Sequence, residues 1–179
     1  MEAKAFSSID LVAQCMADEE RSSAFERAIS EAVRPGMRVL DVGTGTGLLA
    51  MFAVRAGAKH VYALEYDPFV AAAARENIKN NGFQDKVTVL EGDANEYKYQ
   101  LMEPFDVVIK ELLTTGKIDE VQVTASNNLH TNKVVTSSTV FVPHEIHSYA
   151  SLGYMDFSIN GLSMEMVRHL WQGFPDRER

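Results

Sequence analysis

The sequence predicts an α/β fold in which helices cover a doubly wound, mostly parallel, Rossmann-like sheet. Short apolar stretches typical of buried strands alternate with longer stretches of helical periodicity. A glycine-rich turn follows the first apolar stretch, and acidic residues follow the next ones. Alternating strands and helices indicate βαβ units. Ligands of such sheets bind outside the carboxyl ends of the strands, where all of these motifs fall.

Each predicted element has its own local signal. Apolar residues recur at helical spacing in 7–18 and 20–33, and Pro35 with Gly36 predicts a turn before the first strand. Gly57 and Gly82 are expected just beyond the ends of two later helices. The expected core is strand 37–43, helix 46–57, strand 59–65, helix 68–82, strand 86–94, strand 104–111, helix 119–130 and strand 134–143.

The chain is expected to form one domain over 1–179, divided into N-terminal helices at 1–35, a core at 36–143 and a C-terminal part at 144–179. This last part is predicted to begin with a strand at 145–154. Near its end, several apolar side chains are expected to pack on the sheet edge or to form a homodimer contact. The residues concerned are Leu162, Met164, Met166, Val167, Leu170 and Trp171.

Composition narrows the class of function. The chain has 179 residues, 46% of them hydrophobic, and a formal net charge of −8. An acidic domain is a poor partner for nucleic acid, since such binding rests on Lys and Arg. Cys15 is the single cysteine, so the chain has no internal disulfide. His144 and His147 lack a third ligand at metal spacing, so no metal is expected. No long apolar run is present, and a cytoplasmic protein without a membrane partner is expected.

The glycine turn predicts the kind of cofactor. Gly43, Gly45 and Gly47 lie between the first strand and its helix, with Leu48 at the position where the dinucleotide fingerprint requires a glycine. No Lys or Arg lies between Asp41 and Val54 to meet a phosphate. This pattern favours an uncharged-linker nucleoside such as S-adenosylmethionine over a dinucleotide. The alternative is a tight turn without a ligand. Asp41 and Thr44 are included in the predicted site.

Two further strand ends supply polar groups. Glu65 ends the second strand about twenty residues after the glycine turn, where an acid can accept hydrogen bonds from both ribose hydroxyls. Tyr66 follows it and is included in the predicted site; the alternative for Glu65 is a capping or solvated acid. Asp93 and Ala94 end the third strand, where a carboxylate and nearby backbone can bind an adenine ring.

The segments "VLDVGTGTG", the strand end at Glu65 and "EGDA" together resemble the class I S-adenosylmethionine-dependent methyltransferases. The flanks resemble protein arginine methyltransferases more closely. Asp18 and Arg21 match an Asp-x-x-Arg pattern in that family, in which the arginine binds the cofactor's methionine carboxylate. The resemblance therefore implies that role for Arg21, and a guanidinium suits it because it can bind a carboxylate with two parallel hydrogen bonds.

Glu111 and Glu120 match that family's pair of catalytic glutamates in spacing. The resemblance implies that they hold a guanidinium, which does not deprotonate in practice, and aim one nitrogen at the methyl group. The alternative for Glu120 is an acid at a helix N-terminus, where the macrodipole favours negative charge.

The sequence also departs from the arginine methyltransferase pattern. Residues 112–116 read Leu-Leu-Thr-Thr-Gly where the family is aromatic and apolar, Lys110 stands where the family has serine, and Asn95 stands at its adenine-binding glutamate. The family continues beyond the equivalent of Pro143 into a β-barrel that forms one wall of the substrate groove.

We therefore expect a methyltransferase acting on a protein or small-molecule acceptor, with arginine or another amine nitrogen as the target. Two alternatives stay open. A small-molecule N- or O-methyltransferase is favoured by the short chain, and a non-catalytic cofactor-binding subunit would need a second chain to complete its groove.

Overall fold

The computed structural model of the chain describes residues 14–99, 102–112, 120–147, 158–159 and 162–163. Its centre is a five-stranded parallel sheet in the order β3-β2-β1-β4-β5. The order reverses between β1 and β4, the position at which sheets of this kind bind ligands. The predicted α/β class is confirmed. The strands are β1 Arg38–Val42, β2 His60–Glu65, β3 Val87–Glu91, β4 Val107–Lys110 and β5 Val140–Val142.

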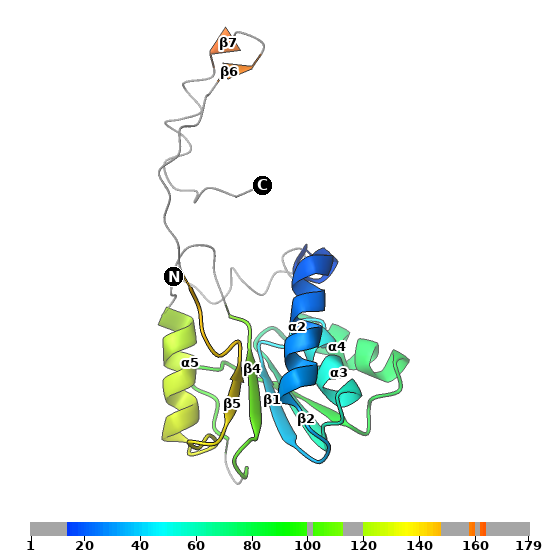
Figure 1. Cartoon of the computed structure of the whole chain (residues 1–179), viewed down its shortest axis with the longest axis vertical. Helices are drawn as coiled ribbons and strands as arrows, with labels where there is room; N and C mark the ends of the chain where they lie inside the picture. The colour runs from blue at the N-terminus through cyan, green and yellow to red at the C-terminus, as the bar shows by residue number, and fades with distance from the viewer. Residues whose placement is uncertain (1–13, 100–101, 113–119, 148–157, 160–161, 164–179) are drawn as a thin grey trace.

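Helices cover both faces of the sheet (Figure 1). The helices α2 Glu19–Ala32, α3 Leu48–Arg55 and α4 Pro68–Asn80 pack on one face, and α5 Glu120–Thr131 packs on the other. Side chains alternate between the faces along each strand. In β1, Val39 joins the cluster with α2, α3 and α4, whereas Leu40 joins the cluster with Leu129 of α5.

The helix ends follow the local signals of the sequence. Asp18 precedes α2 and accepts a hydrogen bond from the backbone N–H of Arg21 at 2.9 Å. Asp67 precedes α4 and accepts from the N–H groups of Phe69 and Val70, with Pro68 at the start of the helix. These are the capping contacts that aspartate makes at a helix N-terminus, so the chain itself specifies where both helices begin.

The predicted strand at 134–143 was wrong over most of its length, because only Val140–Val142 forms β5. A turn precedes β5, in which the hydroxyl of Thr139 accepts the backbone N–H of Thr136 at 2.9 Å. Local hydroxyl-to-backbone bonds of this kind compete with pairing in a sheet. Pairing therefore starts only after the turn.

The predictions for the two ends of the chain fall mainly outside the described residues. In the first predicted helix, residues 14–17 are helical, and in the strand predicted at 145–154, residues 145–147 are not part of a strand. The C-terminal part contributes the antiparallel pair β6 Ser158–Ile159 and β7 Leu162–Ser163, in which Leu162 is 65% exposed. The other tail residues lie outside the description. Among the described helices, none has the length and apolarity needed to cross a bilayer.

Candidate functional site

The parallel register places the carboxyl ends of β1, β2, β3 and β4 next to one another. Val42 of β1 pairs with Leu64 of β2 and with Lys110 of β4, and Glu65 pairs with Glu91 of β3. The polar residues that follow these positions therefore gather around the switch in strand order. The sequence-predicted site lies here, on elements whose positions the sheet fixes.

The glycine turn after β1 requires glycine for two physical reasons. Gly43, Gly45 and Gly47 all have positive φ, at 75°, 55° and 84°, a region that other residues enter only with strain. A Cβ on Gly43 would also stand 2.6 Å from Cδ2 of Leu112. The turn therefore needs glycine for its backbone conformation, and at Gly43 also for the close approach of Leu112.

Glu65 fastens this turn to the end of β2. Its side chain is only 5% exposed, and its Oε2 atom accepts the N–H of Gly45 at 2.9 Å. Its Oε1 atom accepts the N–H of Asp67 at 3.0 Å. Each carboxylate oxygen can accept a further bond, so the residue can serve the turn and a ligand hydroxyl together. Glu65 is therefore not a solvated acid. The neighbouring Tyr66 is 39% exposed.

Asp41 is a buried carboxyl beneath the turn. It is 1% exposed, and its Oδ2 atom accepts the Thr44 hydroxyl at 2.6 Å. Its Oδ1 atom is buried without a hydrogen-bond partner among the described residues. Burial raises the pKa of Asp41 to about 7, the Thr44 hydroxyl opposes that shift, and the charges of Glu65 and Glu111 add to it.

The loop after β3 is held by α5. Asp93 accepts the N–H of Asn95 through Oδ1 at 2.8 Å. Asn128 donates its amide to the carbonyl oxygens of Ala94 and Tyr97 at 3.0 and 2.9 Å. Asn128 was not among the predicted site residues. Its place inside a helix is the signal that could have indicated it, because asparagine has a poor intrinsic preference for that position. The Oδ1 atom of Asn95 is buried without a partner in the described part of the chain.

The closest link between predicted site residues joins Arg21 and Glu111. Nη2 of Arg21 donates to Oε2 of Glu111 at 2.5 Å, and Nη1 donates to the carbonyl of Cys15 at 3.1 Å. The two side chains are 23% and 19% exposed, and the guanidinium lies over the ring of Phe25 at 5.2 Å. Residues 90 positions apart thus form one ion pair at the end of β4.

The second predicted glutamate is placed only by its backbone. Glu120 is the first residue of α5, and its side chain lies outside the described atoms. That position agrees with both interpretations of Glu120: a clamp, in which Glu111 and Glu120 together hold the acceptor guanidinium, and an acid that only favours the helix N-terminus. Lys110, the departure noted beside Glu111, is turned toward α5, where its Nζ donates to the hydroxyl of Ser126 at 2.5 Å. Burial lowers the pKa of Lys110.

Comparison with known proteins decides the family. The family model described as ribosomal protein L11 methyltransferase (PrmA) matches residues 24–142, which is well over half of the chain. The chain belongs to this methyltransferase family. The predicted assignment to S-adenosylmethionine-dependent methyltransferases with a Rossmann-like sheet is thereby confirmed.

The chain is also similar to individual known proteins. It is 46% identical over 114 residues to the uncharacterized protein MJ1452 of Methanocaldococcus jannaschii, covering 64% of this chain and 42% of that one. It is 35% identical over 150 residues to protein arginine N-methyltransferase 7 of Danio rerio, covering 78% and 22%. The solved Trypanosoma brucei PRMT1 enzyme-prozyme heterotetrameric complex with AdoHcy matches with a TM-score of 0.67 and 30% identity, over 76% and 43%. The chain therefore spans less than half of each of these proteins.

The methyltransferase's strand-end residues fit S-adenosylmethionine chemically. Glu65 offers acceptors for ribose hydroxyls, and three of the five N–H groups of Arg21 are not engaged by the Cys15 carbonyl or Glu111. The unpartnered Oδ1 atoms of Asp41 and Asn95 are acceptors suited to the amino groups of such a ligand. The roles of the individual residues stay predictions. Among the described residues, no group of three acidic, histidine or cysteine side chains could hold a metal ion.

Asp41 predicts how the stability of the methyltransferase depends on pH. Its pKa is about 7 in the folded state against an ordinary value of 3.8, so the folded state binds one more proton than the unfolded state between these pH values. Stability should fall as pH rises through about 4–7 and then level off, by up to about 1.4 kcal/mol per pH unit. Urea unfolding from pH 4 to 8 should show this slope for wild type and a smaller one for Asp41→Asn.

The matched control is Asp85→Asn, which removes an exposed carboxylate. The difference in unfolding free energy between Asp85→Asn and wild type should be nearly constant with pH. Parallel curves for wild type and Asp41→Asn would show that Asp41 titrates alike in both states, contrary to this prediction.

Proposed function

We propose that this chain is the cofactor-binding and catalytic part of a methyltransferase whose acceptor is a guanidinium nitrogen, with protein arginine as the leading substrate. The observation that carries the proposal is the ion pair at the end of β4. Glu111, the carboxylate predicted to hold an acceptor guanidinium, holds a guanidinium in this structure, that of Arg21. The position, charge and exposure of Glu111 therefore suit such a group. The resemblance to protein arginine N-methyltransferase 7 agrees with this substrate.

The proposed mechanism assigns each residue a separate task. Glu65 would bind the ribose hydroxyls, and the free N–H groups of Arg21 would bind the methionine carboxylate. When bound, S-adenosylmethionine supplies an electrophilic methyl on a sulfonium. Glu111 would orient the acceptor so that the lone pair of one nitrogen faces that methyl, and the nitrogen's proton would leave to the carboxylate or to water. Positioning of this kind accounts for most of the acceleration in such a displacement.

The family model supports a second acceptor, because its description names ribosomal protein L11 as the protein that is methylated. In that case Glu111 would face a group of ribosomal protein L11. The heterotetrameric enzyme-prozyme assembly of the Trypanosoma protein also keeps open a role as a subunit that needs a partner chain.

The test measures transfer of labelled methyl from S-adenosylmethionine to four acceptors. These are an arginine-rich peptide, the same peptide with lysine at each arginine, free arginine, and ribosomal protein L11. We expect methylation of the arginine peptide and at least about tenfold less of its lysine counterpart. Titration calorimetry with S-adenosylhomocysteine accompanies it, and NAD and ATP should not compete with S-adenosylhomocysteine for its site.

Each failure has a different meaning. Binding of NAD without S-adenosylhomocysteine would refute the methyltransferase activity. Methylation of the lysine peptide alone, or of ribosomal protein L11 only at a group other than arginine, would refute a guanidinium acceptor. Cofactor binding with no transfer to any acceptor would favour the subunit role.

A further inference from the structure

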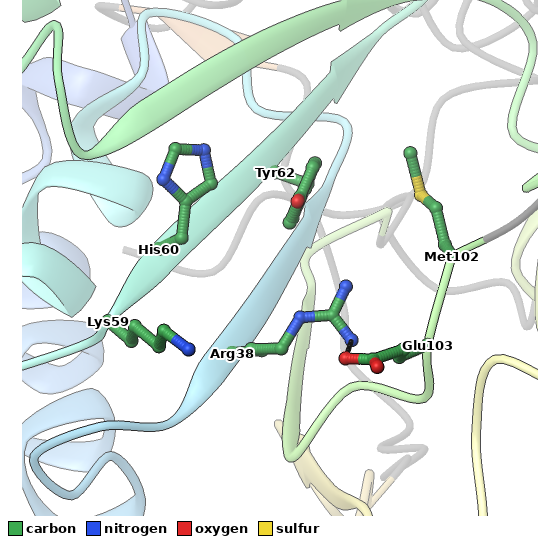
Figure 2. Close-up of a pocket in the computed structure, with 6 residues that line it drawn as sticks. All are labelled: Arg38, Lys59, His60, Tyr62, Met102 and Glu103. Carbon is green, nitrogen blue, oxygen red and sulfur yellow. Dashed lines mark hydrogen bonds and ion pairs between the residues drawn. The ribbon is translucent and has the colours of Figure 1, made fainter.

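A cavity lies at the amino-terminal ends of β1 and β2, whereas the glycine turn lies at the carboxyl end of β1. Figure 2 shows the residues that line it. Its volume is about 410 Å³. Arg38 and His60 are the first residues of their strands and are register partners. None of the lining residues belongs to the predicted cofactor site. They are Arg38, Lys59, His60, Tyr62, Met102 and Glu103.

The fold explains why polar side chains gather in this corner. Arg38, His60 and Tyr62 alternate with core positions, so they point to the face of the sheet that carries α5. Further along the same face, Leu40 and Leu64 are buried against the α5 side. At the amino ends that cover is incomplete, and His60 and Tyr62 stay partly exposed.

The corner carries a small excess of positive charge although the chain as a whole has a net charge of −8. Its cations are Arg38, Lys59 and Lys86, and its carboxylates are Glu103 and Asp106, which accepts the backbone N–H of Arg38 at 2.7 Å. Nη1 of Arg38 donates to the carbonyl of Pro104 at 3.1 Å and approaches Oε2 of Glu103 at 3.5 Å. The Nη2 and Nε groups of Arg38 and the ammonium of Lys59 have no partner among the described residues. The side chain of Glu103 is 85% exposed, so solvent weakens its compensating charge.

Arg38 is held in place before any ligand arrives. Its guanidinium lies 5.6 Å from the ring centre of Tyr62 and 5.1 Å from that of Phe105, and its side chain is 18% exposed. His60 packs its ring edge to Tyr62 at 4.9 Å and bonds to the Thr88 hydroxyl through Nε2 at 2.7 Å. A guanidinium fixed against aromatic faces loses little freedom when it binds an anion.

His60 reports the same positive field. Burial lowers its pKa, and the charges of Lys86 and Arg38 lower it further. The charges of Lys86 and Arg38 thus both act on His60, and a bound anion would oppose their effect.

We propose that this cavity binds a small anion with a planar group, of the nucleoside monophosphate class. Arg38 and Lys59 would hold the phosphate, and Tyr62 and Met102 would contact the planar base. Guanidinium groups bind phosphate oxygens in pairs, and thioether and aromatic side chains pack well on flat rings. The volume lies within the range of small-molecule sites. The proposal does not depend on the methyl acceptor.

The test is a titration of the isotope-labelled protein with adenosine monophosphate, followed by amide NMR in saturating S-adenosylhomocysteine, which occupies the cofactor site. If S-adenosylhomocysteine does not bind, the same titration is run without it, and the two proposals are then judged separately. We expect shifts at Arg38, Lys59 and His60 and a rise in the pKa of His60. Inorganic phosphate should bind more weakly at the same residues, and adenosine should not bind there.

Three variants test the contacts. Arg38→Gln should weaken binding of adenosine monophosphate at least about tenfold, and Lys59→Gln about threefold, since its ammonium is exposed. Lys79→Gln, which removes an exposed charge from α4, should leave affinity unchanged. Lys59→Gln keeps the test decisive if Arg38→Gln fails to fold, because the side chain of Lys59 is exposed and the substitution leaves its backbone hydrogen bond to Met37 in place.

Several results would overturn the proposal. One is the absence of NMR shifts at the three residues at about 10 mM nucleotide, because a dissociation constant above that concentration means negligible affinity. Another is equal binding of adenosine and adenosine monophosphate, which would show that the anion is not recognised. Binding of an aspartate-rich peptide without binding of the nucleotide would exclude the nucleotide class. An equal loss in Lys59→Gln and Lys79→Gln would show unspecific charge attraction.

Discussion

Replacing Glu111 with glutamine is expected to lower the rate of methyl transfer by about 10²–10³-fold, the usual effect of losing one preorganised electrostatic contact. Glutamine keeps the size of the side chain and removes the charge that faces the acceptor. The melting temperature should change little, because the amide oxygen of glutamine can still accept the Arg21 hydrogen bond and Glu111 belongs to neither apolar cluster. Single-turnover rates on the methylated acceptor, measured beside melting curves, provide the check.

The same substitution separates catalysis from cofactor binding. Glu111→Gln removes the charged partner of Arg21 but leaves the Cys15 carbonyl contact, so affinity for S-adenosylhomocysteine should stay within about threefold. Glu76→Gln, an exposed glutamate of α4, is the matched control and should keep full activity. Full turnover of Glu111→Gln on the true acceptor would end the catalytic interpretation.

Glu120→Gln decides between the two interpretations of the second glutamate. If it works as a clamp with Glu111, its turnover should collapse while cofactor affinity is kept. If it only favours the N-terminus of α5, activity should persist and stability should fall by about 0.3–1 kcal/mol. Turnover and melting temperature of this variant therefore give opposite patterns for the two cases.

Replacing Glu65 with alanine is expected to lower affinity for S-adenosylhomocysteine at least tenfold, because charge-assisted hydrogen bonds contribute about 1.5–3 kcal/mol each. The substitution also leaves the N–H groups of Gly45 and Asp67 without their acceptor, so unfolding free energy should drop by about 1–3 kcal/mol. Titration calorimetry and urea unfolding measure the two effects. An unchanged dissociation constant in a folded variant would mean that Glu65 serves the turn alone.

Two controls identify the cause of a loss. Glu91→Ala removes the register partner of Glu65, an exposed acid paired with Arg75 at 2.7 Å, and should leave cofactor affinity unchanged. A 2′,3′-dideoxy analogue of S-adenosylhomocysteine should bind wild type weakly and bind Glu65→Ala as well as the parent compound does. A further loss with the analogue in Glu65→Ala would show that the hydroxyls bind elsewhere.

Local patterns predicted most of the sheet and helices correctly. Asp18, Asp67 and Pro68 mark helix starts through short-range bonds and backbone restriction, and Gly57 and Gly82 follow helix ends in the left-handed region. The helix at 119–130 formed in spite of its β-branched residues, because Ala125 and Leu129 are buried on its inner side. Among the described residues, the largest error in the sheet was the length of β5, which came from a hydroxyl-bonded turn just before the strand.

By itself the sequence determined the fold class, the alternation of elements and the placement of the glycine turn, Glu65 and Glu111 at strand ends. These depend on periodicity and on contacts between near neighbours, which residue types specify directly. Only the tertiary structure decided the Arg21–Glu111 ion pair, the hold of Asn128 on the β3 loop, the raised pKa of Asp41 and the cationic cavity beside Arg38. Each depends on burial or on contacts between distant residues, and these exist only once the parallel sheet has set its register.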